Sequence, residues 1–228
     1  MAEFLQIALI PLSLTLASYQ LGLFIQKKLR SPLFNPILIA VAVILAFLAL
    51  MGMDTATYQA GMTYLSWLLT PATICLAIPL YQQFSVLKKD LPGILAGIAA
   101  GTVASLGFVL GWGLLFQYDR ALLMSLLPKS VTSAIGVPLS QMGGGISPIC
   151  TTAIILTGIL GSLLGPVFCK LFRLKTDIAR GVAFGTAAHV IGTTKANELS
   201  PLAGAVSSLS LVIAGLMTSV LFPLLLAI

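Results

Sequence analysis

The stretch LLPKSVTSAIGVPLSQMGGGISP, residues 126–148, places a charge and several hydroxyl groups inside apolar sequence. Its residues that can bind an anion are Lys129, Ser130, Thr132 and Ser133. An ionised side chain at the bilayer centre costs roughly 2.5–3.5 kcal/mol, so Lys129 requires a compensating role. Pro128 predicts a helix start, with free N–H groups at 129–131 and the positive end of the helix dipole beside them. These groups favour a small carboxylate, although Lys129 can alternatively snorkel to an interface.

A second break is predicted near Thr70, where a proline follows inside an apolar segment. The stretches 68–80 and 126–139 share two leucines, a first proline, a small and hydroxyl-rich run, and a second proline followed by leucine. Two facing helix starts of this kind would cradle a carboxylate, with Thr70 and Thr73 completing the site around Lys129.

The matching continues beyond the two breaks, at offsets of 56 or 57 residues. The matched pairs are Pro92 with Pro148, Gly101 with Gly158, and Ser105 with Ser162. Interrupted segments at corresponding positions of two halves mark binding sites in transporters. We therefore expect an inverted repeat, with units of about 60–116 and 121–172 and broken elements at 70–80 and 127–140.

Another polar stretch, GTAAHVIGTTKANE at 185–198, contains the only histidine of the chain. His189 is either a satisfied core residue or a group that binds an anion or a proton, since its unperturbed pKa is about 6.5. We expect a break at 192–194, with His189 and Thr193 lining the substrate site. Lys195 and Glu198 are three residues apart and can form an ion pair. Asn35 is expected to cap the second helix.

The composition requires a membrane around these groups. Of the 228 residues, 58% are hydrophobic and only 8% are charged, whereas soluble domains carry about 25% charged residues. We predict one all-α polytopic membrane domain over residues 1–228, with about 6–8 membrane segments, two or more of them interrupted or re-entrant. The apolar segments are roughly 4–26, 33–52, 60–84, 91–116, 121–145, 148–169, 181–198 and 202–228.

The net charge of +6 comes from short clusters of cations between apolar segments, which is typical of cytoplasmic loops and does not indicate nucleic acid binding. The cluster at 170–180 is expected on the same side of the membrane as the cluster at 85–90. The placement of the cations therefore favours a re-entrant hairpin at 121–145. The segment 60–84 matches it in sequence but is expected to cross the membrane fully, so the sequence match and the placement of the cations conflict.

Small residues recur at helical spacing in two segments. They are Gly93, Gly97, Gly101 and Ser105 in the first, and Gly158, Gly161 and Gly165 in the second. Such stripes let another helix backbone approach closely. They predict tight packing, with a sliding surface between moving parts as the alternative.

Catalytic and metal-binding signatures are absent from the sequence. The three cysteines form no CxxC pattern and no cluster with histidine, so we expect no metal and no other cofactor. GxSxG and HExxH do not occur, and Lys129 and Ser130 would point apart on a helix. We therefore expect that the protein is not an enzyme.

LPKSVTSAIGVPLSQMGG resembles the P-K-S-V-T-x-P-I-A stretch of the LrgB/CidB family of bacterial inner-membrane proteins. GTAAHVIGTTKANE is similar to that family's G-T-A-S-H-x-x-G-T-A-R-x-x-E, and FNPILIA, PLYQQ and GAVSSLSLVIAG fit its other marked stretches in order. Ala134 stands where the family usually has proline, which leaves the geometry of the break open. Lys195 stands where arginine is frequent, which weakens a bidentate grip on a carboxylate.

The resemblance implies a multi-pass protein of the bacterial cytoplasmic membrane. It also implies a small partner of the LrgA/CidA type, and we expect a homo-oligomer, a dimer. Similar proteins include the plastid glycolate/glycerate translocator and bacterial pyruvate uptake systems. With the half-helices and the buried lysine, this favours a carrier for small monocarboxylates such as pyruvate, glycolate or lactate. The alternative is a holin-like or antiholin-like pore, or a regulator of murein hydrolases and autolysis.

Overall fold

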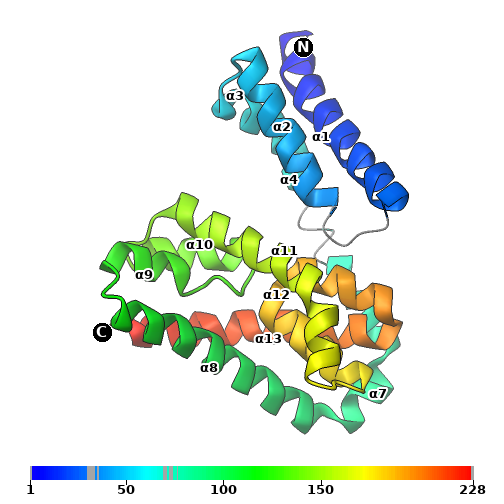
Figure 1. Cartoon of the computed structure of the whole chain (residues 1–228), viewed down its shortest axis with the longest axis vertical. Helices are drawn as coiled ribbons and strands as arrows, with labels where there is room; N and C mark the ends of the chain where they lie inside the picture. The colour runs from blue at the N-terminus through cyan, green and yellow to red at the C-terminus, as the bar shows by residue number, and fades with distance from the viewer. Residues whose placement is uncertain are drawn as a thin grey trace. The chain divides into compact units, whose positions relative to one another are not determined.

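The computed structural model describes residues 2–29, 34, 36–68, 71, 74, 75 and 77–226. The described residues are mostly helical, and none of them forms a strand. The chain divides into two compact units, Met1–Cys75 and Leu76–Ile228 (Figure 1). Asn35, Thr70 and Thr73 lie outside the described residues, as do other positions of the break predicted at 70–80.

The first unit is built on two long helices that pack against each other. Its helices are α1 (Ala2–Leu29), α2 (Pro36–Met51), α3 (Thr55–Gly61) and α4 (Thr63–Trp67). A Cβ atom at Gly22 would lie 2.6 Å from the carbonyl oxygen of Pro36, so glycine lets the start of α2 approach α1. The hydroxyl groups of Thr15 and Tyr58 lie 2.6 Å apart and link α1 to α3.

The second unit contains the polar stretches singled out above. Its helices are α6 (Ala77–Gln82), α7 (Phe84–Lys89), α8 (Leu91–Leu115), α9 (Arg120–Leu126), α10 (Ser133–Met142), α11 (Ser147–Leu171), α12 (Asp177–Leu199) and α13 (Pro201–Leu225). The polar residues therefore lie on a framework of four helices of 23–25 residues, α8, α11, α12 and α13, with shorter helices before and between them.

Four helices in the described part of the chain are long and apolar enough to cross a membrane. They are Leu9–Leu29, Leu91–Leu115, Ser147–Leu171 and Pro201–Leu225. The 25-residue helices among them are about 37 Å long, which exceeds the hydrocarbon core of about 30 Å. The all-helical fold is thus confirmed, and four spans are what these lengths and compositions support.

Helices α8 and α11 match in length and in both ends. Each has 25 residues and a proline in its first turn. After each helix one residue has positive φ, Gln117 (52°) and Arg173 (53°), and the next N–H donates to the carbonyl five residues earlier at 2.8 Å. This pattern is the Schellman motif, in which glycine is the usual residue with positive φ.

Helix α12 consists of two arms that fold back on each other. Its backbone leaves the helical region at Ala188 (φ −132°, ψ 16°) and His189 (φ 42°, ψ −134°). A Cβ atom at Gly192 would lie 2.5 Å from the carbonyl oxygen of Phe184, whereas eight residues of straight helix span about 12 Å. The break predicted at 192–194 is therefore wrong: the chain reverses at 188–189, and residues 190–199 are helical.

Helices α9 and α10 form a second hairpin. They have 7 and 10 residues, and the non-helical stretch 127–132 joins them. The helix start predicted at Pro128 is wrong, because α10 begins at Ser133 with Thr132 as its N-cap. The N–H of Lys129 is not free but donates to the carbonyl of Leu126 at 3.1 Å, in the turn that ends α9.

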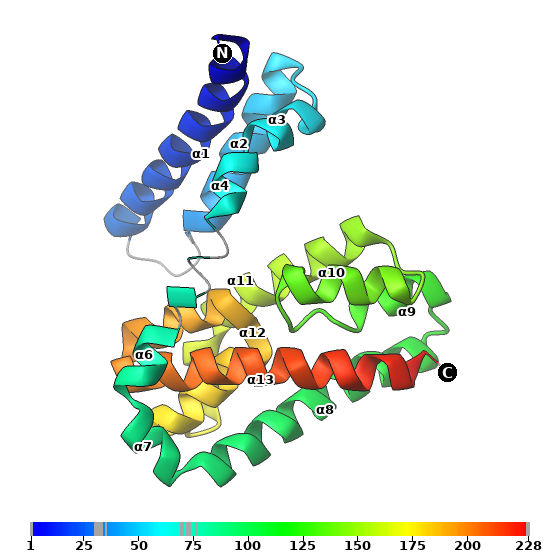
Figure 2. The same ribbon diagram turned by 180° about the vertical axis from the view of Figure 1, so that it is seen from behind.

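The two hairpins enter the second unit from opposite ends (Figures 1 and 2). Gly97 of α8 meets Val182 of α12 and Gly101 meets Thr186, so α8 runs in the same direction as the first arm of α12. The glycines of α11 meet that helix in reverse order: Gly165 at Phe184, Gly161 at Ala188 and Gly158 at His189. The α12 hairpin thus starts where α11 ends, and the α9–α10 hairpin starts where α8 ends.

Candidate functional site

A small cavity lies where the tip of the α9–α10 hairpin meets α8, α12 and α13. Its volume is about 10 Å³, which is close to the space that one water molecule requires. Five lining residues carry hydroxyl groups: Thr102, Ser105, Ser130, Thr186 and Thr218. In this conformation the cavity is small and lined partly by hydroxyl groups, and it has no room for a three-carbon carboxylate.

Two hydroxyl groups at this cavity are buried without a hydrogen-bond partner among the described residues. They belong to Thr102 and Thr186, whose residues are 4% and 6% exposed. A buried polar group without a partner costs roughly 1–3 kcal/mol. The Ser105 and Ser130 hydroxyls lie 2.8 Å apart and join α8 to the hairpin tip. The cavity therefore offers hydrogen bonds to a small polar guest that the protein itself does not use.

Lys129 approaches the cavity through its neighbour. Its ammonium group donates to the Ser130 hydroxyl at 3.3 Å and is partly buried. Within the described residues no carboxylate forms an ion pair with it. The charge thus has a hydroxyl partner but no counter-ion, which is the condition under which a bound anion stabilises it.

The start of α10 lies beside the same tip. Thr132 is the N-cap, but its side chain accepts no capping hydrogen bond. The N–H groups of Ser133 and Ala134 have no partner in the described part of the chain. The Ser133 side chain is exposed. Of the four predicted anion ligands, only Ser130 is among the residues that line the cavity.

His189 and Thr193 hold the α12 hairpin in place and do not line the cavity. The His189 Nε2–H group donates to the Ile154 carbonyl oxygen at 3.0 Å. The Thr193 hydroxyl donates to the His189 carbonyl at 2.9 Å and lies 2.8 Å from that of Ser207. These bonds fix the reversal at 188–189 against α11 and α13.

Lys195 and Glu198, the other predicted polar residues that the structure describes, do not line the cavity. Lys195 and Glu198 form the ion pair that their spacing predicts, at 2.6 Å, and the glutamate is largely exposed. Sequence reasoning missed Thr102, Thr186 and Thr218. Two of them could have been found from the sequence, because Thr102 directly follows Gly101 and Thr186 directly follows Gly185. Each hydroxyl group therefore lies beside a point where two helices approach closely.

Comparison with known proteins places the chain in a family. Residues 15–228 match the model of the LrgB-like family, and the protein belongs to that family. Two relatives from strains of Staphylococcus epidermidis, each named Holin-like protein CidB, are 37% identical to it over 225 residues. The match covers 99% of this chain and 98% of theirs. No solved structure matches it.

The resemblance to the LrgB/CidB family is thereby confirmed. The name of the two relatives supports the holin-like alternative more than it supports a monocarboxylate carrier, and neither name specifies a substrate. Together with the four long apolar helices, the family assignment identifies a membrane protein.

Proposed function

We propose that this protein is a holin-like membrane protein whose conducting path is narrow and gated, and that the path carries small anions past the tips of its two hairpins. The observation that carries this proposal is the small hydroxyl-lined cavity with a lysine beside it that pairs with no carboxylate of the described residues. Bacterial cytoplasmic membrane is the proposed location, and no catalysis is proposed.

The hairpins give this path its gate. Helices α9 and α10, with 7 and 10 residues, are about 10–15 Å long and cannot cross a hydrocarbon core of about 30 Å. We therefore propose that α9–α10 and α12 are re-entrant hairpins that approach from opposite membrane faces. Non-helical backbone at membrane depth is tolerated where protein buries it or where it lines a cavity. A small displacement of either tip opens the cavity toward one face.

We propose small monocarboxylates, such as pyruvate, glycolate or lactate, as the anions. Lys129, Ser130 and the free N–H groups at the start of α10 provide a positive charge and donors to a carboxylate. The apolar residues Leu106, Leu127 and Val131 provide a surface for a short carbon chain. Because the cavity is water-sized, binding requires the tips to separate.

A wider pore is the second candidate, and the name of the two relatives favours it. In that case the conducting form is an oligomer, such as a dimer, or a complex with a small LrgA/CidA-type partner. A regulator of murein hydrolases that conducts nothing by itself is a variant of this candidate.

Proteoliposomes distinguish these functions. The purified protein is reconstituted with and without the small partner, and both counterflow of labelled pyruvate and release of a trapped fluorescent dye are measured. Saturable pyruvate flux without dye release supports the narrow path. Dye release supports the wide pore, and the absence of both fluxes with the partner present supports a regulator.

A further inference from the structure

A second cavity, of about 360 Å³, lies at the end of the second unit where α11 finishes and both ends of the α12 hairpin meet. Four of its lining residues are cations: Lys170, Arg173, Lys175 and Arg180. Its remaining walls come from Pro166, Cys169, Leu174 and Leu199. The cavity is therefore apolar at its walls and positively charged at its rim.

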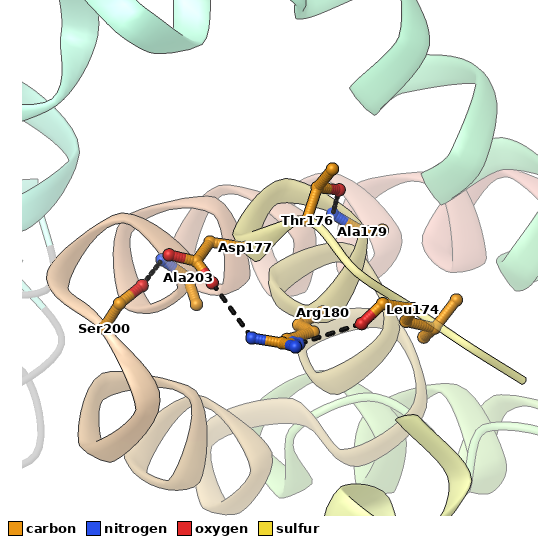
Figure 3. Close-up of polar contacts among 7 residues, drawn as sticks. All are labelled: Leu174, Thr176, Asp177, Ala179, Arg180, Ser200 and Ala203. Carbon is orange, nitrogen blue, oxygen red and sulfur yellow. Dashed lines mark hydrogen bonds and ion pairs between the residues drawn. The ribbon is translucent and has the colours of Figure 1, made fainter. Parts of the chain in front are cut away.

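One of the four cations is fixed by the protein. The Arg180 guanidinium donates to the Leu174 carbonyl at 3.0 Å and pairs with Asp177 at 3.2 Å (Figure 3). The other three cations have no carboxylate partner among the described residues. One acid against four cations leaves three positive charges around the cavity without compensation, which favours an anionic occupant.

The position of Arg173 strengthens this reading. It is exposed and has φ 53°, in the Schellman position that glycine occupies most easily. A non-glycine residue in the left-handed region costs backbone energy, because its Cβ atom crowds the following carbonyl oxygen. The backbone conformation at residue 173 favours glycine, so backbone energy does not explain why an arginine stands there.

We propose that this cavity binds the headgroup of an anionic phospholipid. Its phosphate lies among Lys170, Arg173 and Lys175, and its glycerol and upper acyl chains lie against the apolar walls. The side of α11 next to the cavity is itself apolar and exposed: Val167 and Leu171 expose 60% and 67% of their surface. A free phosphate uses the cations but gains nothing from these apolar groups. Basic pockets between membrane helices are known to bind such headgroups.

Native mass spectrometry of the purified full chain tests this proposal by comparing binding of phosphatidylglycerol and phosphatidylcholine. Wild type prefers phosphatidylglycerol. The double variant Arg173→Gly/Lys175→Gln, which loses two cations, binds phosphatidylglycerol about tenfold more weakly or worse. Lys170→Gln/Lys175→Gln, which leaves the backbone at 173 unchanged, gives a similar loss.

Two controls separate a specific site from general surface charge. Lys88→Gln/Lys89→Gln removes the same charge from α7, which lies at the same end of this unit (Figures 1 and 2), and leaves phosphatidylglycerol binding unchanged. Gln117→Gly repeats the glycine substitution after α8, away from the cavity, and also changes nothing. Equal loss in the α7 variant, no preference between the lipids, or displacement of the lipid by glycerol phosphate at equal affinity would overturn the proposal.

Discussion

At the scale of single residues, backbone geometry distinguishes His189 from an ordinary buried histidine. With φ 42° and ψ −134° it stands in a region that residues with a Cβ atom rarely adopt. Its ring bond to the Ile154 carbonyl and its contact with Gly158 hold it there. No glycine or proline occupies the reversal point, so nothing in the residue types at 188–189 predicts the turn.

Substituting His189 separates the backbone effect from the side-chain effect. His189→Ala and His189→Gly both lose the bond to Ile154 and leave the same space at the ring, so both should be less stable than wild type. The glycine variant relieves the strain at positive φ and should therefore be about 1 kcal/mol more stable than the alanine variant. Thermal unfolding in detergent compares the two, and a more stable alanine variant would show that the reversal carries no strain.

At the scale of helices, sequence predicted the small-residue contacts better than it predicted the breaks. Gly97, Gly101 and the three glycines of α11 all face α12 at close approach, as the stripes predict, whereas Gly93 faces open space. The break at 127–132 was found because proline and hydroxyl residues mark it. Its helix start was misplaced because the turn after α9 uses the N–H groups of Lys129 and Val131, which a start at Pro128 would leave free.

The glycine contacts predict that replacing glycine by alanine at two positions of α8 has different effects on stability. Gly101→Ala places a Cβ atom 2.8 Å from Thr186 Cγ2, so it should destabilise the protein and displace a cavity residue. Gly93→Ala meets nothing within 4 Å and should be neutral or stabilising by up to about 1 kcal/mol, because alanine is the better helix former. Thermal unfolding measures both; similar losses at the two positions would contradict the predicted contact.

The reversal in α12 can be measured directly as a distance. Spin labels at Ala179 and Glu198 would be about 28 Å apart along a straight helix of 19 residue steps. In the hairpin both positions lie at the same end, since the adjacent Arg180 and Leu199 line one cavity. Double electron–electron resonance should therefore give a clearly shorter distance, and a main peak at the straight-helix value would exclude the hairpin.

At the scale of the whole molecule, the offset of 56 or 57 residues takes on a structural meaning. It relates α8 to α11, and it relates the hairpin that begins at Arg120 to the one that begins at Asp177. The helices α8 and α11 run in opposite directions, so we propose that the two helix–hairpin pairs form an inverted repeat. Sequence reasoning found the offset but matched the hairpin at 126–139 with 68–80, because prolines are visible in both and the reversal at His189 has none.

The central claim is that small anions cross beside Lys129, and saturable uptake by one pair of variants tests it most directly. Lys129→Met keeps the length of the side chain and removes its charge, so it should insert at least as well as wild type. It should lose most pyruvate uptake at low concentration, and Lys129→Arg should retain part of it. Lys195→Met, at an ion-paired lysine away from the cavity, is the control and should keep its uptake.

The measurement is uptake of labelled pyruvate into proteoliposomes at matched protein abundance. The account predicts saturable uptake by wild type and by Lys195→Met, and little by Lys129→Met. Wild-type uptake by Lys129→Met together with loss in Lys195→Met would contradict the account and would move the anion site to the region of His189 and Lys195.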